Sequence, residues 1–283
     1  MSKIAGIVVK VSLQPIIKDY ASATTEFTGL TTTTKPRMGR IQGIVLISGA
    51  NRGVGFELTR ALLANEAVAR VYAGCRNSEK AENLRTLQDP QKKLRIVDLD
   101  VSKDWSIKNV VEAVANESGQ INVLVNNAAI LEKDHKAGIP DGDRGVWLRH
   151  FDINVVSYAM MIQECLPLLR KSTSQEQPAT IINISGRKGS IELCPGTERV
   201  HGNYAYMCSK TAVNHLTRIL SIEQSDILTV SMCPGWNRTD MGGPSGMKDP
   251  SETAPVLLST VDAMTISEHS GKFWDRKGRP IPY

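Results

Sequence analysis

The chain has 283 residues, of which 41% are hydrophobic and 22% charged, and its formal net charge is +5. This composition is typical of one large globular domain whose core needs no disulfides or metals. No run of five Lys or Arg occurs and only 5% of residues are aromatic, which disfavours nucleic-acid binding.

The cysteines and histidines indicate no metal site or disulfide framework. The five cysteines are scattered, odd in number and without a Cys-x-x-Cys pair, so we expect reduced thiols and a cytoplasmic location. The sequence has no His-Glu-x-x-His motif and no Gly-x-Ser-x-Gly elbow, which disfavours metalloproteases and hydrolases. No run approaches the roughly 18 apolar residues of a membrane span, so we expect no membrane partner.

The first part of the chain differs from the rest. The apolar run Ile4–Val9 is too short for the core of a signal peptide and ends at Lys10. The segment Ser22–Thr34 is rich in Ser and Thr. We therefore expect residues 1–42 to be a loosely ordered N-terminal extension and residues 43–283 to form the domain.

From residue 43 onward, short apolar runs alternate with helix-like segments. The predicted strands are Ile44–Ser48, Arg70–Gly74, Leu94–Leu99, Asn122–Asn126, Thr180–Ser185, Leu228–Cys233 and Gly271–Trp274. The predicted helices are Gly55–Ala64, Glu79–Gln88, Ser106–Glu117, a long one around Trp147–Leu169, and Ala205–Ser225. Near-continuous apolar strands are typical of parallel strands covered on both faces. The alternation predicts a single-domain α/β fold, a Rossmann-type doubly wound parallel sheet of about seven strands with helices on both faces.

A glycine-rich turn lies between the first predicted strand and its helix. Glycines permit a tight turn and let the backbone approach a pyrophosphate, which rests on the positive end of the helix. Such a turn alone is a weak signal and could be an ordinary loop, but its position favours a dinucleotide cofactor. The residues of the turn expected to contact the cofactor are Gly49, Asn51, Arg52, Gly53, Val54 and Gly55.

The second predicted strand is followed by an arginine, Arg76. An NAD site usually has a carboxylate near this point, whereas arginine suits the 2′-phosphate of NADP(H). Arg52 of the glycine turn can reach the same phosphate, so the sequence favours NADP(H). Alternatively, both guanidinium groups are solvated surface charges.

Polar residues also end the third and fourth predicted strands. In open α/β sheets the carboxyl ends of the strands line the ligand crevice, so we expect Asp100, Val101 and Asn127 to contact the cofactor. Such side chains, Asn126 above all, could instead only satisfy buried backbone groups.

Tyr206 and Lys210 are four residues apart in a predicted helix, so they lie on one face of it. A free tyrosine has a pKa of about 10 and is a poor acid–base catalyst near neutrality. An ammonium about 4 Å away would lower that pKa by roughly 3, partly offset by burial. Tyr204 lacks such a partner, because Cys208 stands four residues after it. The tuned phenol and the glycine turn together predict a hydride-transfer enzyme.

With these motifs in this order, residues 43–283 resemble the short-chain dehydrogenase/reductase superfamily. The closest likeness is to its carbonyl reductase, Sniffer and C-factor group and to fungal ketoreductases. The matching motifs are Gly49/Gly53/Gly55, Asp100-Val101, Asn126-Asn127-Ala128, Asn154, Tyr206/Lys210 and the segment 234–241. The resemblance implies a Rossmann-type domain that interconverts a carbonyl compound and an alcohol with NAD(P).

The resemblance also implies roles for single residues. Tyr206 would donate the proton to the carbonyl oxygen, and Lys210 would lower its pKa and hold the nicotinamide ribose. Asn154 would anchor a water that links the lysine to solvent. Further contacts with the cofactor are implied for Pro234, Gly235, Asn237 and Thr239.

Two positions depart from the family's pattern. Ala129 replaces a glycine near the cofactor, and Gly186 replaces the second of two serines, the one that polarises the substrate carbonyl. Ser185 or Ser190 could substitute, although Ser185 could equally point away, since side chains alternate along a strand. Losing one such donor costs about a hundred- to a thousandfold in rate.

The sequence thus predicts an NADP(H)-dependent reductase of a ketone or aldehyde, whose catalytic residues are Tyr206, Lys210, Asn154 and Ser185. The alternative is an NADP(H)-binding signalling or sensor protein with impaired catalysis, which the missing serine favours. The segment Met241–Pro255 is interpreted as a mobile apolar cover. An apolar or aromatic substrate is expected in a pocket lined by Trp147, Trp236 and Met241. The resemblance implies that the chain can assemble as a homodimer or a homotetramer, and the sequence does not decide between these and a monomer.

Overall fold

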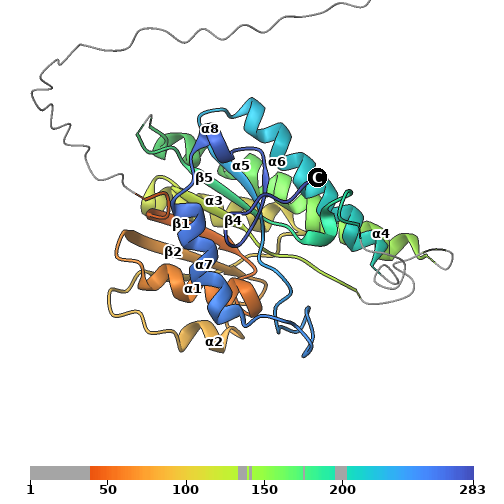
Figure 1. Ribbon diagram of the computed structural model, residues 1–283. Coiled ribbons are helices and arrows are strands. Elements are labelled where there is room, and N and C mark those ends of the chain that lie inside the picture. Colours follow the sequence, from red (N-terminus) through yellow and green to blue (C-terminus); the bar gives the residue numbers. More distant parts are fainter. Residues whose placement is uncertain (1–38, 133–138, 140–141, 175, 195–202) are drawn as a thin grey trace, which may run out of the picture. The chain divides into compact units, whose positions relative to one another are not determined.

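The computed structural model describes residues 39–132, 139, 142–174, 176–194 and 203–283. Within these ranges seven strands form one parallel sheet in the order β3-β2-β1-β4-β5-β6-β7 (Figure 1). The strands are β1 (Gly43–Ser48), β2 (Val68–Cys75), β3 (Leu94–Asp98), β4 (Val123–Asn126), β5 (Thr180–Ile184), β6 (Leu228–Cys233) and β7 (Phe273–Asp275). The predicted doubly wound parallel sheet is confirmed.

Helices connect the strands. They are α1 (Gly53–Ala64), α2 (Glu82–Arg85), α3 (Asp104–Ser118), α4 (Arg144–Phe151), the π-helical turn η2 (Asp152–Val156), α5 (Ser157–Ser172), the 3₁₀ turn η3 (Arg187–Gly189), α6 (Tyr204–Glu223), α7 (Pro250–Asp262) and α8 (Ile266–His269). The helix expected over Glu79–Gln88 is confined to the single turn α2, and the π turn divides the long one around Trp147–Leu169. In the part of the chain that the structure describes, no helix combines the length and apolarity of a membrane span.

Successive residues of the central strands pack into opposite layers of the domain. Val45 and Ile47 of β1 lie in one buried cluster with side chains of α1 and α7, which pack together on that face (Figure 1). Leu46, between them, lies in a second cluster with side chains of α3 and α5. Because both faces of the sheet are covered, β1 is apolar at successive positions over Val45, Leu46 and Ile47.

Helix α7 corrects the interpretation of Met241–Pro255 as a mobile cover, because the last part of that segment is helical. The Asp249 side chain caps the helix by accepting a hydrogen bond from the Ser251 N–H at 2.9 Å. Pro250 occupies the first turn, where its missing N–H costs nothing.

Residues 1–38 of the expected extension lie outside the described residues. Residues 39–42, which we assigned to the same extension, pack on the domain. Ile41 is buried, its N–H donates to Asp262 at 2.8 Å, and its carbonyl accepts from the Asn65 side chain at 3.0 Å. Packing on the domain therefore begins before β1.

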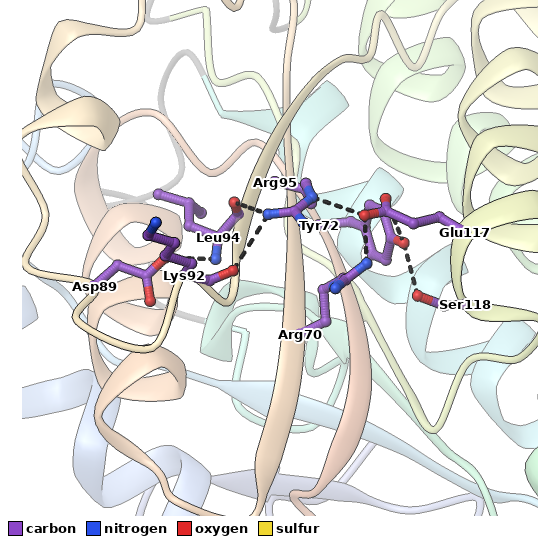
Figure 2. Close-up of polar contacts among 8 residues, drawn as sticks. All are labelled: Arg70, Tyr72, Asp89, Lys92, Leu94, Arg95, Glu117 and Ser118. Atoms are coloured by element: carbon purple, nitrogen blue, oxygen red, sulfur yellow. Dashed lines mark hydrogen bonds and ion pairs between the residues drawn. The ribbon is translucent and has the colours of Figure 1, made fainter.

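A cluster of charged side chains ties α3 to the outer strands β2 and β3 (Figure 2). Glu117 accepts hydrogen bonds from Arg70, from Arg95 at 2.8 Å and from the Tyr72 hydroxyl at 2.9 Å. Ser118 Oγ lies 2.7 Å from the same hydroxyl. Partial burial raises the pKa of Glu117, but hydrogen bonds from Arg95 and Tyr72 and the charge of Arg70 outweigh this and lower it. One carboxylate therefore joins three elements.

We expect Glu117→Gln to lower the free energy of unfolding by about 1 kcal/mol at neutral pH, because two guanidinium groups lose their counter-charge. The Glu117 side chain is 37% exposed, so solvent screening keeps the effect small. A carboxylate whose pKa is lowered on folding stabilises the folded state at pH values above its unfolded pKa of about 4.3. This stabilisation is lost as the pH falls through the pKa of the folded state. Urea unfolding at pH 7 and pH 3 tests this, with Glu112→Gln on the exposed face of α3 as control. An equal loss at both pH values would contradict it.

Candidate active site

The glycine turn between β1 and α1 leaves a helix N-terminus open to a ligand. Gly49 and Gly53 have φ angles of 68° and 56°, which residues with side chains rarely adopt. A Cβ atom on Gly55 would overlap the Gly49 carbonyl oxygen, so the turn is tight. Arg52 caps α1 without a side-chain hydrogen bond, and the first helical bond runs from Phe56 N to the Arg52 carbonyl at 3.2 Å. The N–H groups before that bond can hold a pyrophosphate, so the turn fits a dinucleotide.

Asn127 holds this turn in place. Its side-chain amide donates to the carbonyls of Ser48 at 3.1 Å and Gly49 at 3.0 Å, and its own N–H donates to the Ser48 hydroxyl. The side chain of Val54 packs on the core rather than on the outside of the turn. Asn126 is fully buried, and its side-chain amide donates to the Asn183 side chain of β5 at 2.9 Å rather than to a backbone group. A direct contact of Asn127 with the cofactor stays a prediction.

The two arginines expected to bind the 2′-phosphate are accessible. Arg52 pairs with Asp240 at 2.9 Å, and the two side chains are 62% and 74% exposed, so the glycine turn is joined to the loop after β6. Arg76 is exposed immediately after β2. An acid that the sequence pattern does not single out, Asp98, ends the neighbouring strand and accepts from the Ser78 N–H at 2.6 Å.

Asp100 and Val101 follow β3. The Asp100 carboxylate accepts hydrogen bonds from the N–H of Ser102 at 3.1 Å and from its hydroxyl at 2.7 Å, which starts the turn into α3. Val101 is buried beside α3. Their expected contacts with the cofactor stay predictions.

The loop after β6 faces the glycine turn. The Asn237 side-chain amide donates to the carbonyls of Pro234 at 3.1 Å and Gly235 at 3.0 Å, and its oxygen accepts a hydrogen bond from α7 at 2.6 Å. The Thr239 methyl lies 3.2 Å from the position that a Cβ atom on Gly53 would occupy. Asn237 is buried and shapes the loop, and Thr239 brings the loop against the turn.

Tyr206 and Lys210 lie on α6 as predicted, and Tyr158 of α5 lies beside them. Lys210 is buried, and its Nζ donates to the Ile184 carbonyl at 2.8 Å and lies 3.5 Å from the Tyr158 hydroxyl. The same Nζ is 5.8 Å from the centre of the Tyr206 ring and 5.2 Å from that of Tyr158. The lysine therefore lies between two phenol rings at the end of β5.

Burial raises the pKa of Tyr206 and lowers the pKa of Lys210 to about 7. In this structure the effect of burial sets the direction of the Tyr206 pKa, and a lowering of that pKa by Lys210 stays a prediction. Low dielectric favours the neutral form of both groups, and a partly deprotonated lysine offers little charge to a phenolate. Tyr206 keeps its proton near neutral pH, which suits an acid rather than a base.

Asn154 lies in the π turn η2, a kind of turn that is frequent at functional sites. Its amide donates to the Ile130 carbonyl and to the Ser209 hydroxyl, both at 3.0 Å, and its oxygen accepts from the Ile130 N–H at 2.8 Å. Asn154 therefore joins the loop after β4 to helix α6. The water that we expect it to anchor stays a prediction.

The segment that follows β5 shows which position faces Tyr206. A Cβ atom on Gly186 would lie 3.2 Å from the Tyr206 hydroxyl. The Ser185 hydroxyl donates to the Lys210 carbonyl at 3.3 Å, and Ser190 Oγ accepts from a backbone N–H three residues on at 3.1 Å. Both serines are buried. The prediction that Ser185 is catalytic finds no support in these hydrogen bonds.

Comparison with known proteins identifies the family. Residues 43–249 match the short chain dehydrogenase family, more than half of the chain. The chain belongs to the short-chain dehydrogenase family. The short-chain dehydrogenase anuI of Penicillium roqueforti is 30% identical over 250 residues, which cover 85% of this chain and 96% of that protein.

Two solved structures of short-chain dehydrogenases are also similar. Carbonyl reductase Sniffer of D. melanogaster has a TM-score of 0.78 at 30% identity, covering 86% of this chain and 100% of that one. The NADPH-bound carbonyl reductase from chicken fatty liver has a TM-score of 0.77 at 30% identity, covering 84% of this chain and 98% of that one.

Two residues of this short-chain dehydrogenase's site are missing from the sequence prediction. Tyr158 stands four residues after Asn154, and Ser209 stands directly before Lys210. An aromatic residue in an amphipathic helix is usually core, so the pattern alone does not single out Tyr158. Its spacing from Asn154 could have identified it, because residues four apart lie on the same face of a helix.

The expected substrate-lining residues lie on different elements. Trp147 of α4 is partly buried and packs near Ala205, the residue before Tyr206. Trp236 is 52% exposed, and its indole N–H donates to the Gly242 carbonyl at 2.8 Å. Met241 is partly exposed in the same loop. A pocket formed by these three side chains stays a prediction.

Proposed function

We propose that this short-chain dehydrogenase reduces a ketone or aldehyde with NADPH and that Tyr206 is its general acid. The observation that supports it most is the Tyr206 hydroxyl, 3.2 Å from the side-chain position of Gly186 at the end of β5 and above the buried Lys210. Similar proteins named carbonyl reductases, one of them bound to NADPH, add to this support.

The residues divide the work as follows. Bound NADPH supplies the hydride. The first turn of α1 would hold its pyrophosphate, Arg52 and Arg76 its 2′-phosphate, and the 234–239 loop the nicotinamide side. Tyr206 donates its proton to the carbonyl oxygen as negative charge develops there. An alkoxide is a stronger base than a phenolate, so the transfer is favourable even though burial raises the pKa of Tyr206.

The raised pKa of Tyr206 favours reduction of a carbonyl compound over oxidation of an alcohol. Oxidising an alcohol requires Tyr206 to act as a base, which means as a phenolate. Burial disfavours that charged form, whereas the protonated form needed for reduction is present at neutral pH. We therefore propose reduction as the working direction.

A second candidate function is an NADP(H)-binding signalling or sensor protein with impaired catalysis. Gly186 supports it, because the side chain that would polarise the carbonyl is missing and the hydroxyls of Ser185 and Ser190 are engaged elsewhere. Losing that donor lowers the rate by about a hundred- to a thousandfold. Such a rate could be too low for a metabolic role.

NADPH oxidation across a panel of aldehydes, aryl ketones and quinones distinguishes the two functions, with NADPH binding measured by fluorescence. Turnover supports the reductase. Tight binding with no turnover of any compound supports the sensor. Failure to bind NADPH contradicts both.

We expect Arg76→Asp to weaken NADPH binding by about 10- to 100-fold, because a carboxylate repels the 2′-phosphate that the guanidinium would pair with. NADH binding should strengthen or stay unchanged, since a carboxylate suits a free ribose diol. Dissociation constants for both cofactors measure the change. Lys171→Asp, at the exposed last turn of α5, makes the same charge change as a control. Equal weakening in both variants would mean that overall charge alone is responsible.

A further inference from the structure

We propose that the substrate itself supplies the hydrogen-bond donor that the described part of the chain does not provide beside Tyr206. The preferred substrates are then aryl aldehydes and ketones that carry a hydroxyl group ortho to the carbonyl. This inference rests on the proposed reductase function and names the substrate class of the same site.

Space for that hydroxyl lies beside Tyr206. Within the described chain and apart from neighbours in sequence, the Tyr206 hydroxyl is the one heavy atom within 4 Å of a Cβ atom on Gly186. The Gly186 backbone is extended, with φ −160° and ψ 148°, so it would accept any residue. The backbone conformation therefore does not require glycine at this position. The missing side chain leaves open space next to the Tyr206 hydroxyl.

The donors around this space are already engaged. The hydroxyl of Ser185 and the Nζ of Lys210 donate to backbone carbonyls at 3.3 and 2.8 Å. In η3 the N–H of Arg187 donates to Cys233 Sγ at 3.2 Å, and that of Gly189 to the Gly186 carbonyl at 2.7 Å. The Ser185 hydroxyl and the N–H groups of Arg187 and Gly189 each have a single hydrogen, so none of these three can turn to a substrate oxygen without giving up a partner.

An ortho hydroxyl meets the chemical need. Reduction breaks the carbonyl π bond: the carbon receives the hydride of NADPH, the oxygen receives the Tyr206 proton, and the products are an alcohol and NADP⁺. The ortho hydroxyl keeps its proton and donates a hydrogen bond to the same oxygen in a six-membered ring. Hydrogen bonds strengthen as the acceptor gains charge, so this bond stabilises the transition state more than the ground state. Solvent returns the proton to Tyr206.

The test compares 2-hydroxyacetophenone with 4-hydroxyacetophenone. Both isomers donate electrons to the carbonyl, but only the first can form the internal hydrogen bond. We expect kcat/KM of the unaltered protein with NADPH to be at least about 10-fold higher for the 2-isomer. In complexes with NADP⁺, where no hydride transfer occurs, calorimetry should also show tighter binding of the 2-isomer.

Two variants at Gly186 assign the effect to the open space. Gly186→Ser supplies a donor from the protein, so kcat/KM for the 4-isomer should rise about 10- to 100-fold and the preference for the 2-isomer should disappear. Gly186→Ala adds the same Cβ atom without a donor, and both isomers should then react more slowly. Its complex with NADP⁺ should no longer prefer the 2-isomer. The two variants impose the same contact on Tyr206 and are therefore matched.

Equal turnover of the two isomers by the unaltered protein would overturn the inference while leaving the proposed reductase intact. A preference that persists unchanged in Gly186→Ser would also overturn it. Absence of turnover with every carbonyl compound would instead contradict the proposed function. If Gly186→Ser does not fold, the isomer ratio of the unaltered protein still decides.

Discussion

Tyr206→Phe is expected to lower kcat for carbonyl reduction by roughly a thousandfold or more, because it removes the proton donor and general acid catalysis contributes about 10²–10⁴-fold. The loss should lie toward the upper end of this range. Gly186 has no side chain to act as a second donor, so in a substrate without an ortho hydroxyl the carbonyl oxygen depends on Tyr206 for both a hydrogen bond and a proton. The glycine turn, which would hold the cofactor's pyrophosphate, is unchanged. NADPH affinity should therefore change by less than about threefold.

Tyr204→Phe is the matched control. It removes one phenol oxygen from the same helix, two residues away, at a partly exposed position. Its kcat should stay close to that of the unaltered protein. Single-turnover kinetics with saturating NADPH separate the chemical step from product release. A Tyr206→Phe variant that keeps more than a tenth of kcat would show that another group supplies the proton.

The sheet could be predicted because its strands are short apolar runs that can be recognised in the sequence. Val45, Leu46 and Ile47 are all apolar although they pack into two different layers, and only a strand covered on both faces requires this. The strand–helix alternation then predicts a parallel, doubly wound sheet with helices on both faces. The short last strand was predicted two residues early, since its pattern is weak.

Helices were predicted less well where only a few residues at a helix end or within one turn indicate the structure. The start signals of α7, Asp249 and Pro250 followed by Glu252, are present in the sequence. Pro255 stands inside the helix and made the segment resemble a loop. The π turn at Asn154 could not be predicted, because one extra residue in a turn has no signature in residue type.

The chemistry-bearing residues could be named from the sequence, but their orientation could not. Spacing brought Tyr206 and Lys210 together, and it could not show that burial would raise the pKa of one and lower that of the other. That outcome depends on side chains from distant segments, such as Tyr158. Likewise, alternation along β5 left Ser185 with two possible directions, and only its contact with α6 decides between them.

Lys210→Met is expected to lower kcat by about a hundredfold or more and at the same time to stabilise the fold. The activity falls because Lys210 is expected to hold the nicotinamide ribose beside Tyr206 and so to position the cofactor for the reaction. Stability rises by about 1–2 kcal/mol near neutral pH, because a buried ammonium is replaced by an apolar side chain of similar length. Removing the lysine leaves the Ile184 carbonyl with the hydrogen bond from the Tyr158 hydroxyl at 3.1 Å.

The stabilisation should depend on pH in a defined direction. Burial lowers the pKa of Lys210 to about 7 in the folded chain, whereas an unfolded lysine has a pKa of about 10.4. Between these values the unfolded chain binds more protons, so the stability of the unaltered protein rises with pH. The gain from Lys210→Met should therefore be largest at and below about pH 7 and shrink toward about pH 10.

Lys93→Met provides the matched control for this prediction. Lys93 is also buried, but its Nζ donates to the Asn65 carbonyl at 2.9 Å, just beyond the C-terminal end of α1 and away from helix α6. Replacing it removes a partner from α1's last turn, so the variant should lose about 1 kcal/mol of stability and keep its kcat. Urea unfolding between pH 6 and 9 measures both variants. If Lys210→Met were destabilised like Lys93→Met, the hydrogen bond of Lys210 to the Ile184 carbonyl would outweigh the cost of burying its charge, and the prediction would be wrong.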